Sequence, residues 1–472
     1  MSKIEVNTIE PQCGTTLTLG GCGQTVTLGS GASQSGFGRT GTVDWVTTVQ
    51  TSTITAATGK GYFVNTTGGA ITANLPAGAA GSIVAFRDYA NTFDSNALTI
   101  AANGSEKING STIDLTVNTE GESITLVYAD STKGWLVVND GNNDAGSQAQ
   151  YVTATGGNST ATCGDYKIHT FTSPGTFCVS CAGNPSGSTT VEYVVVAGGG
   201  GAGASAPTNV MSGAGGAGGF RFASPSLAPL TYPAKPLAGP AALPVTATGY
   251  PVTVGAGGAG GSYCAPSAPG YCGAAGSNSV FTGTTTITSA GGGGGARFTT
   301  CGGNGGSGGG GSQYPGQPTN KGTGNTPPVS PPQGNPGGNG RYCGPDGSTN
   351  SGGGGGGAGA AGSDATSEVG GAGGSGAGLP AGFGSNGEPC GSYRYYAGGG
   401  RGGNNSSASP LAGAIGGGGN GMSNNGTQAC GAGVANTGGG GGGVVSSPST
   451  TPNKTGGAGG SGIVLIRYKF QN

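Results

Sequence analysis

The chain has 472 residues, of which 113 are Gly and 27 are Pro, so these two types make up about 30% of it. That share lies at the level which usually indicates low complexity or disorder, yet only 7% of the residues are charged and the net charge is −1. This composition excludes an ordinary globular enzyme along the full length, and the basic residues are too sparse for a nucleic-acid surface.

The glycine is unevenly distributed along the chain. Residues 1–195 contain 27 Gly, and residues 196–472 contain the other 86. The first part is therefore able to form small apolar cores. The second part cannot offset its backbone entropy by apolar burial alone.

The first 42 residues contain a short repeat, residues 14–22 and 23–31, with a period of nine. Apolar residues alternate in both copies, at Leu17/Leu19 and Val26/Leu28, which predicts short strands. Two such strands cannot bury their apolar faces alone, so we expect residues 1–42 to be a β-repeat stem that needs a partner. The start shows no apolar signal-peptide region, and no apolar run reaches the length of a membrane span.

Residues 43–140 have the pattern of a compact β-sandwich. Short segments with alternating apolar residues are separated by turn signals such as Asn103-Gly104 and Asn109-Gly110. Both tryptophans of the chain, Trp45 and Trp135, lie here, and we expect both in the core. Residues 141–150 are a polar linker. The strand candidates are residues 61–64, 82–86, 97–100, 111–117, 123–128 and 134–138.

The glycine-rich part lies between strand candidates. Residues 166–171, 175–179 and 191–196 precede it, and residues 463–470 follow it. We expect residues 151–197 to form a β base that pairs with a closing strand within residues 463–472. The predicted fold class is therefore all-β.

Residues 198–462 contain twelve glycine-dense runs. They follow no Gly-X-Y register, which excludes collagen. A flexible linker is the alternative, but it explains neither the distinct loops between the runs nor the flanking strands. We predict a slab of polyglycine-II helices that hydrogen-bond to one another, with variable loops at both ends. The runs begin near residues 198, 213, 255, 291, 302, 337, 352, 370, 398, 416, 438 and 456.

The cysteines suggest local bridges rather than a metal site. Cys178-x-x-Cys181 is a lone pair with no partner at zinc-module spacing, so no metal is expected. Cys264 and Cys272 bracket a short loop and form the most natural local disulfide. If successive runs are antiparallel, four more cysteines share one end of the slab and are disulfide candidates: Cys301, Cys343, Cys390 and Cys430.

Catalytic motifs are lacking in the sequence. The two G-x-G-x-x-G matches, at residues 213–218 and 255–260, are expected by chance at this glycine content and precede no helix. His169 is the one histidine, and no nucleophile motif accompanies it. We therefore expect neither an enzyme nor a cofactor.

Tyrosine and arginine on glycine- and serine-rich loops are typical of binding surfaces, because the rings add rigid contact area at low entropy cost. The alternative, that these rings only cover the ends of the slab, stays open. The candidates are Tyr314, Arg341, Tyr342, Tyr393, Arg394, Tyr395 and Tyr396.

Two groups of segments carry a resemblance to known families. Residues 1–9, 88–94 and 131–141 resemble tail-fibre and virion structural proteins of marine phages, including cyanophages. Residues 171–177, 191–200 and 459–468 resemble glycine-rich phage adhesin domains. The distal adhesins of T-even-like phages contain a related polyglycine-II sandwich, whose end loops determine host range.

The resemblance implies a homotrimeric phage tail fibre in the virion. It would be made in the host cytoplasm, bind other tail or baseplate proteins through its N-terminus, and act outside the cell. Its glycine-rich tip would bind a bacterial surface protein or polysaccharide, without nucleic-acid binding or membrane insertion. A structural fibre or decoration protein without a specific receptor is the alternative, and a polysaccharide depolymerase is a more distant one.

Overall fold

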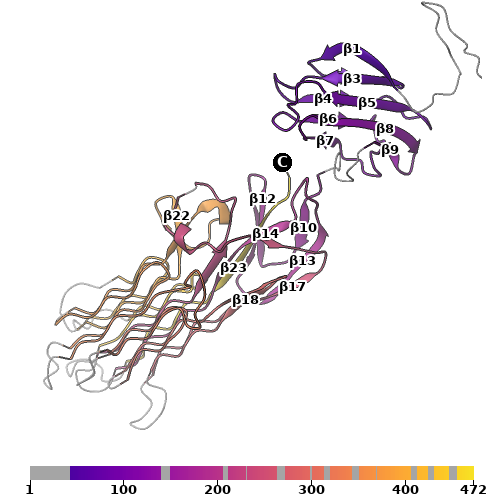
Figure 1. The fold of residues 1–472 in the computed structure, drawn as a ribbon. Helices are drawn as coiled ribbons and strands as arrows, with labels where there is room; N and C mark the ends of the chain where they lie inside the picture. The colour runs from indigo at the N-terminus through magenta and orange to yellow at the C-terminus, as the bar shows by residue number, and fades with distance from the viewer. Residues whose placement is uncertain are drawn as a thin grey trace, which may run out of the picture. The chain divides into compact units, whose positions relative to one another are not determined.

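A computed structural model shows the chain as two compact units, Met1–Gly146 and Ser147–Asn472 (Figure 1). The predicted stem over residues 1–42, most of the linker, and Cys264, Tyr314 and Cys343 lie outside the described residues. Within the described part, no helix has the length and apolar character needed to cross a membrane. The structure describes residues 43–139, 149–205, 211–229, 231–262, 272–297, 300–312, 319–342, 350–367, 369–404, 412–423, 430–445 and 454–471.

The first unit consists of two sheets whose strands alternate along the chain. The pairs β1–β3, β3–β5, β2–β4 and β4–β6 are all parallel, and antiparallel pairing begins with β7 and β8. The sequence predicted the sandwich but not this parallel order. One sheet contains β1 (Asp44–Gln50), β3 (Lys60–Val64), β5 (Ile83–Asp88), β8 (Ser123–Asp130) and β9 (Gly134–Val137), and the other contains β2 (Ile54–Thr55), β4 (Ile71–Asn74), β6 (Leu98–Ala101) and β7 (Leu115–Val117).

The two tryptophans of the first unit lie in different environments. Trp135 is fully buried in the core between the sheets, as predicted. Trp45 is 38% exposed and stacks on Phe63 with ring centroids 4.8 Å apart, so the prediction of a core position was wrong for it. A Cβ on Gly61 would lie 2.8 Å from the Trp45 ring, so this glycine makes room for the indole outside the core.

The base of the second unit consists of two packed sheets. β14 (Thr190–Val196) pairs antiparallel with β23 (Ile463–Lys469), with Val196 opposite Ile463. The two ends of the glycine-rich segment therefore meet in one sheet, which confirms the prediction. The sheet orders are β11-β12-β23-β14-β15, with β16 also on β14, and β10-β13-β17-β18-β19. The remaining bounds are β10 (Val152–Thr155), β11 (Ser159–Cys163), β12 (Tyr166–Phe171), β13 (Gly175–Ala182), β15 (Phe220–Ala223), η1 (Lys235–Leu237), β16 (Leu243–Pro244), β17 (Gly249–Thr253), β18 (Ser279–Thr282) and β19 (Thr286–Ser289).

A small hairpin sheet lies beside this base (Figure 1). It contains β20 (Ala377–Pro380), β21 (Glu388–Cys390) and β22 (Tyr393–Tyr396), in the order β20-β22-β21, and the short helix η2 (Ala381–Phe383) follows β20. Glu388 joins the sheet to the glycine-rich part, because its Oε2 accepts hydrogen bonds from the N–H groups of Gly416 and Gly417, both at 2.7 Å.

The glycine runs hydrogen-bond with a period of three residues. The N–H groups of Gly199 and Ala202 donate to Gly460 and Gly457 in one neighbouring run, at 2.9 and 2.8 Å. The residues between them, Gly200 and Gly201, donate to two other runs. Each run therefore bonds in three directions in turn, as a polyglycine-II helix with three residues per turn does.

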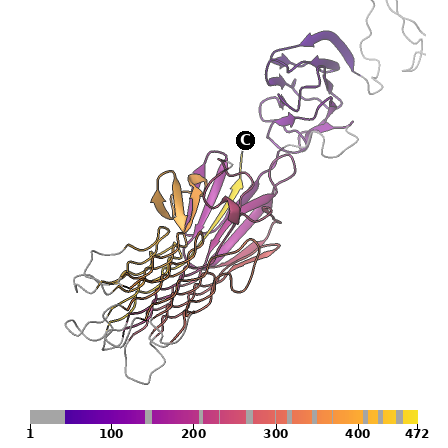
Figure 2. The same cartoon turned by 60° about the vertical axis from the view of Figure 1, so that its left-hand side comes forward.

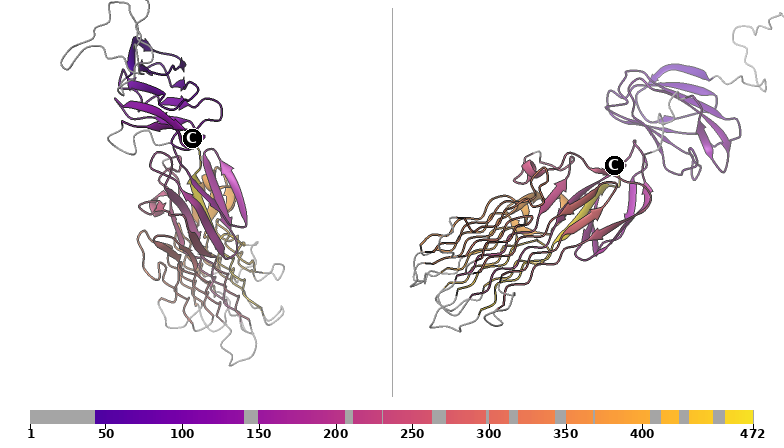
Figure 3. Two further views of the ribbon diagram at one scale, coloured as in Figure 1. Left: turned by 90° about the vertical axis from the view of Figure 1, so that its right-hand side faces the viewer. Right: turned by 60° about the horizontal axis from the view of Figure 1, so that its bottom comes forward.

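The runs lie side by side in one bundle (Figures 2 and 3), and their hydrogen bonds give it a hexagonal order. The central run, residues 212–219, exchanges backbone hydrogen bonds with six runs that also bond to one another in a closed ring. Eleven outer runs surround this ring. The ring contains residues 197–205, 290–296, 307–312, 350–358, 397–404 and 438–445, and the outer runs are 255–262, 272–278, 301–304, 320–323, 334–340, 360–365, 370–376, 412–415, 417–423, 430–434 and 454–462.

The bundle corrects the predicted thin slab of twelve runs. Five outer runs contain few glycines, because a run with neighbours on one side only has room for side chains on the other. The run predicted at residue 302 bends back at residues 305–307 and forms two runs. Successive runs do alternate in direction, so the connections between them alternate between the two ends, but the additional runs change which loops share an end. The five glycine-poor runs are 272–278, 320–323, 360–365, 412–415 and 430–434.

Candidate binding surface

The bundle has two different ends. Near the base, consecutive runs are joined by short described turns, for example at residues 358–360, 415–417 and 435–438. We call the opposite end the far end. The chain runs from β14 to the far end at Ser205, and it runs back from Met211 to β15.

Eight stretches outside the described residues begin and end at the far end. Contacts between their flanking residues show that these flanks form one continuous surface: Ser205 N–H donates to the Lys454 carbonyl at 3.3 Å, and Met211 pairs with Val445. Their sequences are rich in Ser, Pro, Asn and Tyr. The stretches are residues 206–210, 263–271, 298–299, 313–318, 343–349, 405–411, 424–429 and 446–453.

The far end has a small apolar core of its own. Met211, Met422, Val444 and Val445 are at most 3% exposed and pack together, with Cys430 against them. Ser212 reinforces this contact, because its Oγ accepts a hydrogen bond from the Val444 N–H at 2.9 Å. The scaffold that carries the loop flanks is thus fixed by side chains as well as by backbone bonds.

Two of the predicted binding residues lie at the far end. Arg341 and Tyr342 are exposed, and the backbone of Arg341 pairs with Ser351 across the ends of two runs. Tyr342 is 37% exposed, a large value for an aromatic ring at the edge of a packed bundle. The sequence position of Tyr314 falls between two described residues of this same end, Ser312 and Thr319.

The other four predicted residues lie far from these, on β22 beside the base. The sequence placed Tyr396 in a binding loop, but the ring is 1% exposed and its hydroxyl donates to the Asn386 carbonyl at 2.8 Å. Burial also raises the pKa of its hydroxyl far above the usual value. Tyr393, Arg394 and Tyr395 are partly exposed, so the hairpin offers a second, smaller aromatic surface.

The cysteines do not form the predicted group at one end. Cys390 lies on β21 at the base, whereas Cys272, Cys301 and Cys430 lie at the far end. All four are free thiols. Cys272 Sγ is 3.3 Å from the Thr300 hydroxyl, and burial raises the pKa of the Cys430 thiol.

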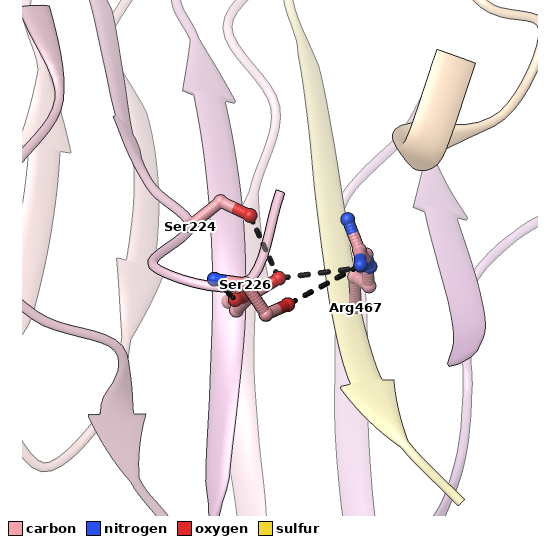
Figure 4. Close-up of polar contacts among 4 residues, drawn as sticks. Ser224, Ser226 and Arg467 are labelled. Carbon is pink, nitrogen blue, oxygen red and sulfur yellow. Dashed lines mark hydrogen bonds and ion pairs between the residues drawn. The ribbon is translucent and has the colours of Figure 1, made fainter. Parts of the chain in front are cut away.

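A buried ion pair in the base was missed by the sequence reasoning (Figure 4). Glu192 on β14 and Arg467 on β23 lie directly opposite each other and are each 5% exposed, with Arg467 Nε 3.6 Å from Glu192 Oε2. Ser224 Oγ and the Ser226 N–H donate to the same carboxylate at 2.7 and 2.9 Å. The guanidinium lies 3.8 Å from the centre of the Tyr166 ring. This arrangement joins three strands and the 224–226 segment, and it indicates a structural role.

His169 also has a structural environment. It is fully buried, with Nδ1 2.7 Å from the Gly156 carbonyl and Nε2 3.2 Å from the Tyr468 hydroxyl. Burial lowers its pKa. Neither a nucleophile nor a paired carboxylate is among its described hydrogen-bond partners.

Comparison with known proteins gives two matches. A stretch of 79 residues is 34% identical to the baseplate wedge protein gp10 of Enterobacteria phage T4. The aligned part is 16% of this chain and 13% of that protein, so the chain spans only a small part of this relative. Residues 172–469 match the model of the glycine-rich domain family. This match extends from the end of β12 to the end of β23 and includes every glycine run, which is more than half of the chain. The chain therefore belongs to the glycine-rich domain family.

Proposed function

We propose that this protein is a phage virion component, a tail-fibre adhesin that binds a receptor on the bacterial surface through the far end of its glycine bundle. The observation that carries the proposal is the convergence of eight loop flanks at one end of a rigid scaffold. Binding sites are usually built from loops positioned in this way. The Ser-, Asn- and Tyr-rich composition of the intervening sequences agrees with it.

The partner is a surface polysaccharide or protein, and no chemistry on it is proposed. Self-association as a homotrimer and attachment to other virion proteins through residues 1–42 belong to the same proposal. They rest on the resemblance to phage fibres and on the similarity to a baseplate wedge protein. That similarity also supports the second candidate, a structural virion protein without a specific receptor.

Adsorption of the full chain separates the two candidates. Fluorescently labelled protein is incubated with cyanobacterial cells, the hosts that the resemblance implies, and cell-bound fluorescence is measured. We expect saturable binding that falls at least tenfold in the double variant Arg341→Ala/Tyr342→Ala. The matched control is Tyr89→Ala, which removes an exposed tyrosine of the first unit (59% exposed).

Two results would contradict the adhesin. Absence of saturable binding across a panel of strains, together with no inhibition of phage infection, favours the purely structural role. Equal binding losses in the double variant and the control show that the far end does not carry the receptor site. Release of reducing ends from host polysaccharide would instead favour a depolymerase.

A further inference from the structure

Two tyrosines share one face of the hairpin sheet beside the base. Tyr393 and Tyr395 are two residues apart on β22, so their side chains point to the same side of the sheet. Tyr396 and the residue opposite it on β20, Ala377, point to the other side, and each is 1% exposed. The apolar core lies on that side. Tyr393 and Tyr395 are therefore on the outer face, where both are partly exposed.

The ring of Tyr395 lies flat on a glycine. Gly378 of β20 is directly opposite Tyr395. A Cβ on Gly378 would lie 2.7, 2.8 and 3.1 Å from three atoms at the hydroxyl end of the Tyr395 ring. Such similar distances to three ring atoms mean that the face of the ring, and not its edge, covers the glycine. A larger residue at position 378 would lift the ring, so this glycine holds Tyr395 as a floor parallel to the sheet.

The ring of Tyr393 stands beside this floor as a wall. The planes of the two rings are at 89°, and their centroids are 6.5 Å apart. Residues two apart on a strand are separated by about 6.8 Å, so the rings stand next to each other and neither covers the other. Tyr393 also packs against the edge of the core cluster that contains Leu379, which holds the wall in place. Among the described residues, Tyr393 is the only aromatic ring paired with that of Tyr395.

Both tyrosine hydroxyls are accessible to a ligand. Neither has a hydrogen-bond partner within the described part of the chain, and neither is a buried group. Burial of part of the side chain raises the pKa of the Tyr395 hydroxyl, and Cys390 and Tyr393 add to the rise. The hydroxyl therefore keeps its proton at physiological pH, and it can donate as well as accept a hydrogen bond.

We propose that Tyr395 and Tyr393 bind one pyranose unit of a neutral surface polysaccharide, at a site separate from the far end. One face of a glucose- or galactose-type ring presents C–H bonds, whose slightly positive hydrogens are attracted by the negative face of an aromatic ring. The sugar lies on Tyr395 with its edge against Tyr393, and the two tyrosine hydroxyls bond to its OH groups. The proposal does not depend on the far end as a receptor site.

The charge and size of the outer face favour a neutral sugar over a protein. None of the six residues that the register places on it is basic, and the one carboxylate, Glu388, already accepts two backbone N–H groups. Three strands of at most four residues give a face of roughly 14 Å by 10 Å. A stable protein interface buries about 800 Å² on each partner, several times this area.

Titration of the full chain with neutral oligosaccharides tests the site. Cellohexaose and β-1,4-galactohexaose are titrated separately by calorimetry, and saturation-transfer difference NMR identifies the sugar protons that contact the protein. We expect at least one of them to bind with a Kd on the order of 1 mM. The largest saturation transfer should fall on the C–H protons of one ring face.

Variants of the two tyrosines assign the binding to the hairpin. Tyr395→Ala should weaken it about tenfold and Tyr393→Ala about threefold, whereas Tyr395→Phe keeps the floor and should retain most of the affinity. Amide hydrogen exchange over residues 377–396 checks that the hairpin stays folded. The matched control is the far-end double variant Arg341→Ala/Tyr342→Ala, which should bind both sugars as the wild type does.

Three outcomes overturn the proposal. One is neither heat nor saturation transfer with either sugar in the wild type, a result that does not depend on any variant folding. Another is equal affinity in the wild type and in Tyr395→Ala. The third is normal binding in Tyr395→Ala together with loss in the far-end double variant, which would move the sugar site to the far end and leave the proposed adhesin intact.

Discussion

Replacing Gly216 by Ala tests whether the glycine bundle is held by direct backbone contact. Gly216 lies in the central run, and a Cβ added there would be 2.4 Å from the Ser307 carbonyl oxygen and 2.6 Å from that of Gly308. An ordinary contact needs at least 3.4 Å, so the neighbouring run must move by about 1 Å. Because that run is itself bonded to other runs, it cannot move alone.

The expected loss follows from the contacts that must change. Overpacking a rigid interior costs about 1–3 kcal/mol, and each backbone hydrogen bond weakened by the shift adds about 1 kcal/mol. We expect Gly216→Ala to lower the free energy of unfolding of the second unit by about 3–5 kcal/mol. The same run already contains Ala217, which is fully buried, so the effect belongs to the position and not to alanine as such.

Calorimetry is the suitable assay, since the second unit contains no tryptophan. The Tm of the second unit should fall by several degrees, and amide hydrogen exchange should accelerate in residues 212–219 and 307–312. Ala217→Gly is the matched control and should cost only about 1 kcal/mol. Unchanged melting and exchange in Gly216→Ala would refute backbone-to-backbone packing of the runs.

Three further predictions concern other parts of the chain. Arg467→Met leaves the Glu192 carboxylate buried without its cation and should lower the free energy of unfolding by about 3–5 kcal/mol. The double variant Arg467→Met/Glu192→Leu should recover most of this loss in calorimetry. No recovery would mean that the pair does not act as a unit. His169 has a lowered pKa in the folded state, so its protonation favours the unfolded state. The stability measured by calorimetry should therefore fall as pH decreases below about 6.5. This dependence of stability on pH should be weaker in His169→Gln, and an unchanged dependence would assign it to other groups. The Cβ that Gly68→Ala adds lies more than 4 Å from every other heavy atom considered. The substitution should therefore stabilise the first unit by up to about 1 kcal/mol in a thermal melt followed by tryptophan fluorescence. A clear destabilisation would show strain at this turn.

The sequence predicted the class of fold better than the arrangement of the bundle. The all-β class, the sandwich and the pairing of β14 with β23 follow from alternating apolar residues, which are a local signal. The hexagonal order was not predictable in this way, because outer runs such as residues 360–365 contain few glycines and resemble loops. The burial of Tyr396 depends on the hairpin that lies beside the base, and its sequence shows only aromatic residues between glycine runs.

The candidate binding surface was predicted in part. Arg341 and Tyr342 lie at the far end because they directly follow the run at residues 334–340, and the spacing of the glycines already suggested that a run ends there. The ion pair of Glu192 and Arg467 was not recognised, since residues so far apart along the chain become neighbours only through the register of β14 and β23.

The direction of the hydrogen bonds in the bundle has a mechanical consequence. All of them run across the axis of the runs, and each inner run bonds to neighbours on every side. A pull on the far end along this axis must therefore shear many bonds at the same time, because bonds that lie across the pull are loaded together and do not open one after another. The load then reaches the base through β14 and β23, which are themselves paired side by side over five residue pairs. Such a bundle resists tension applied between its far end and the strands that anchor it.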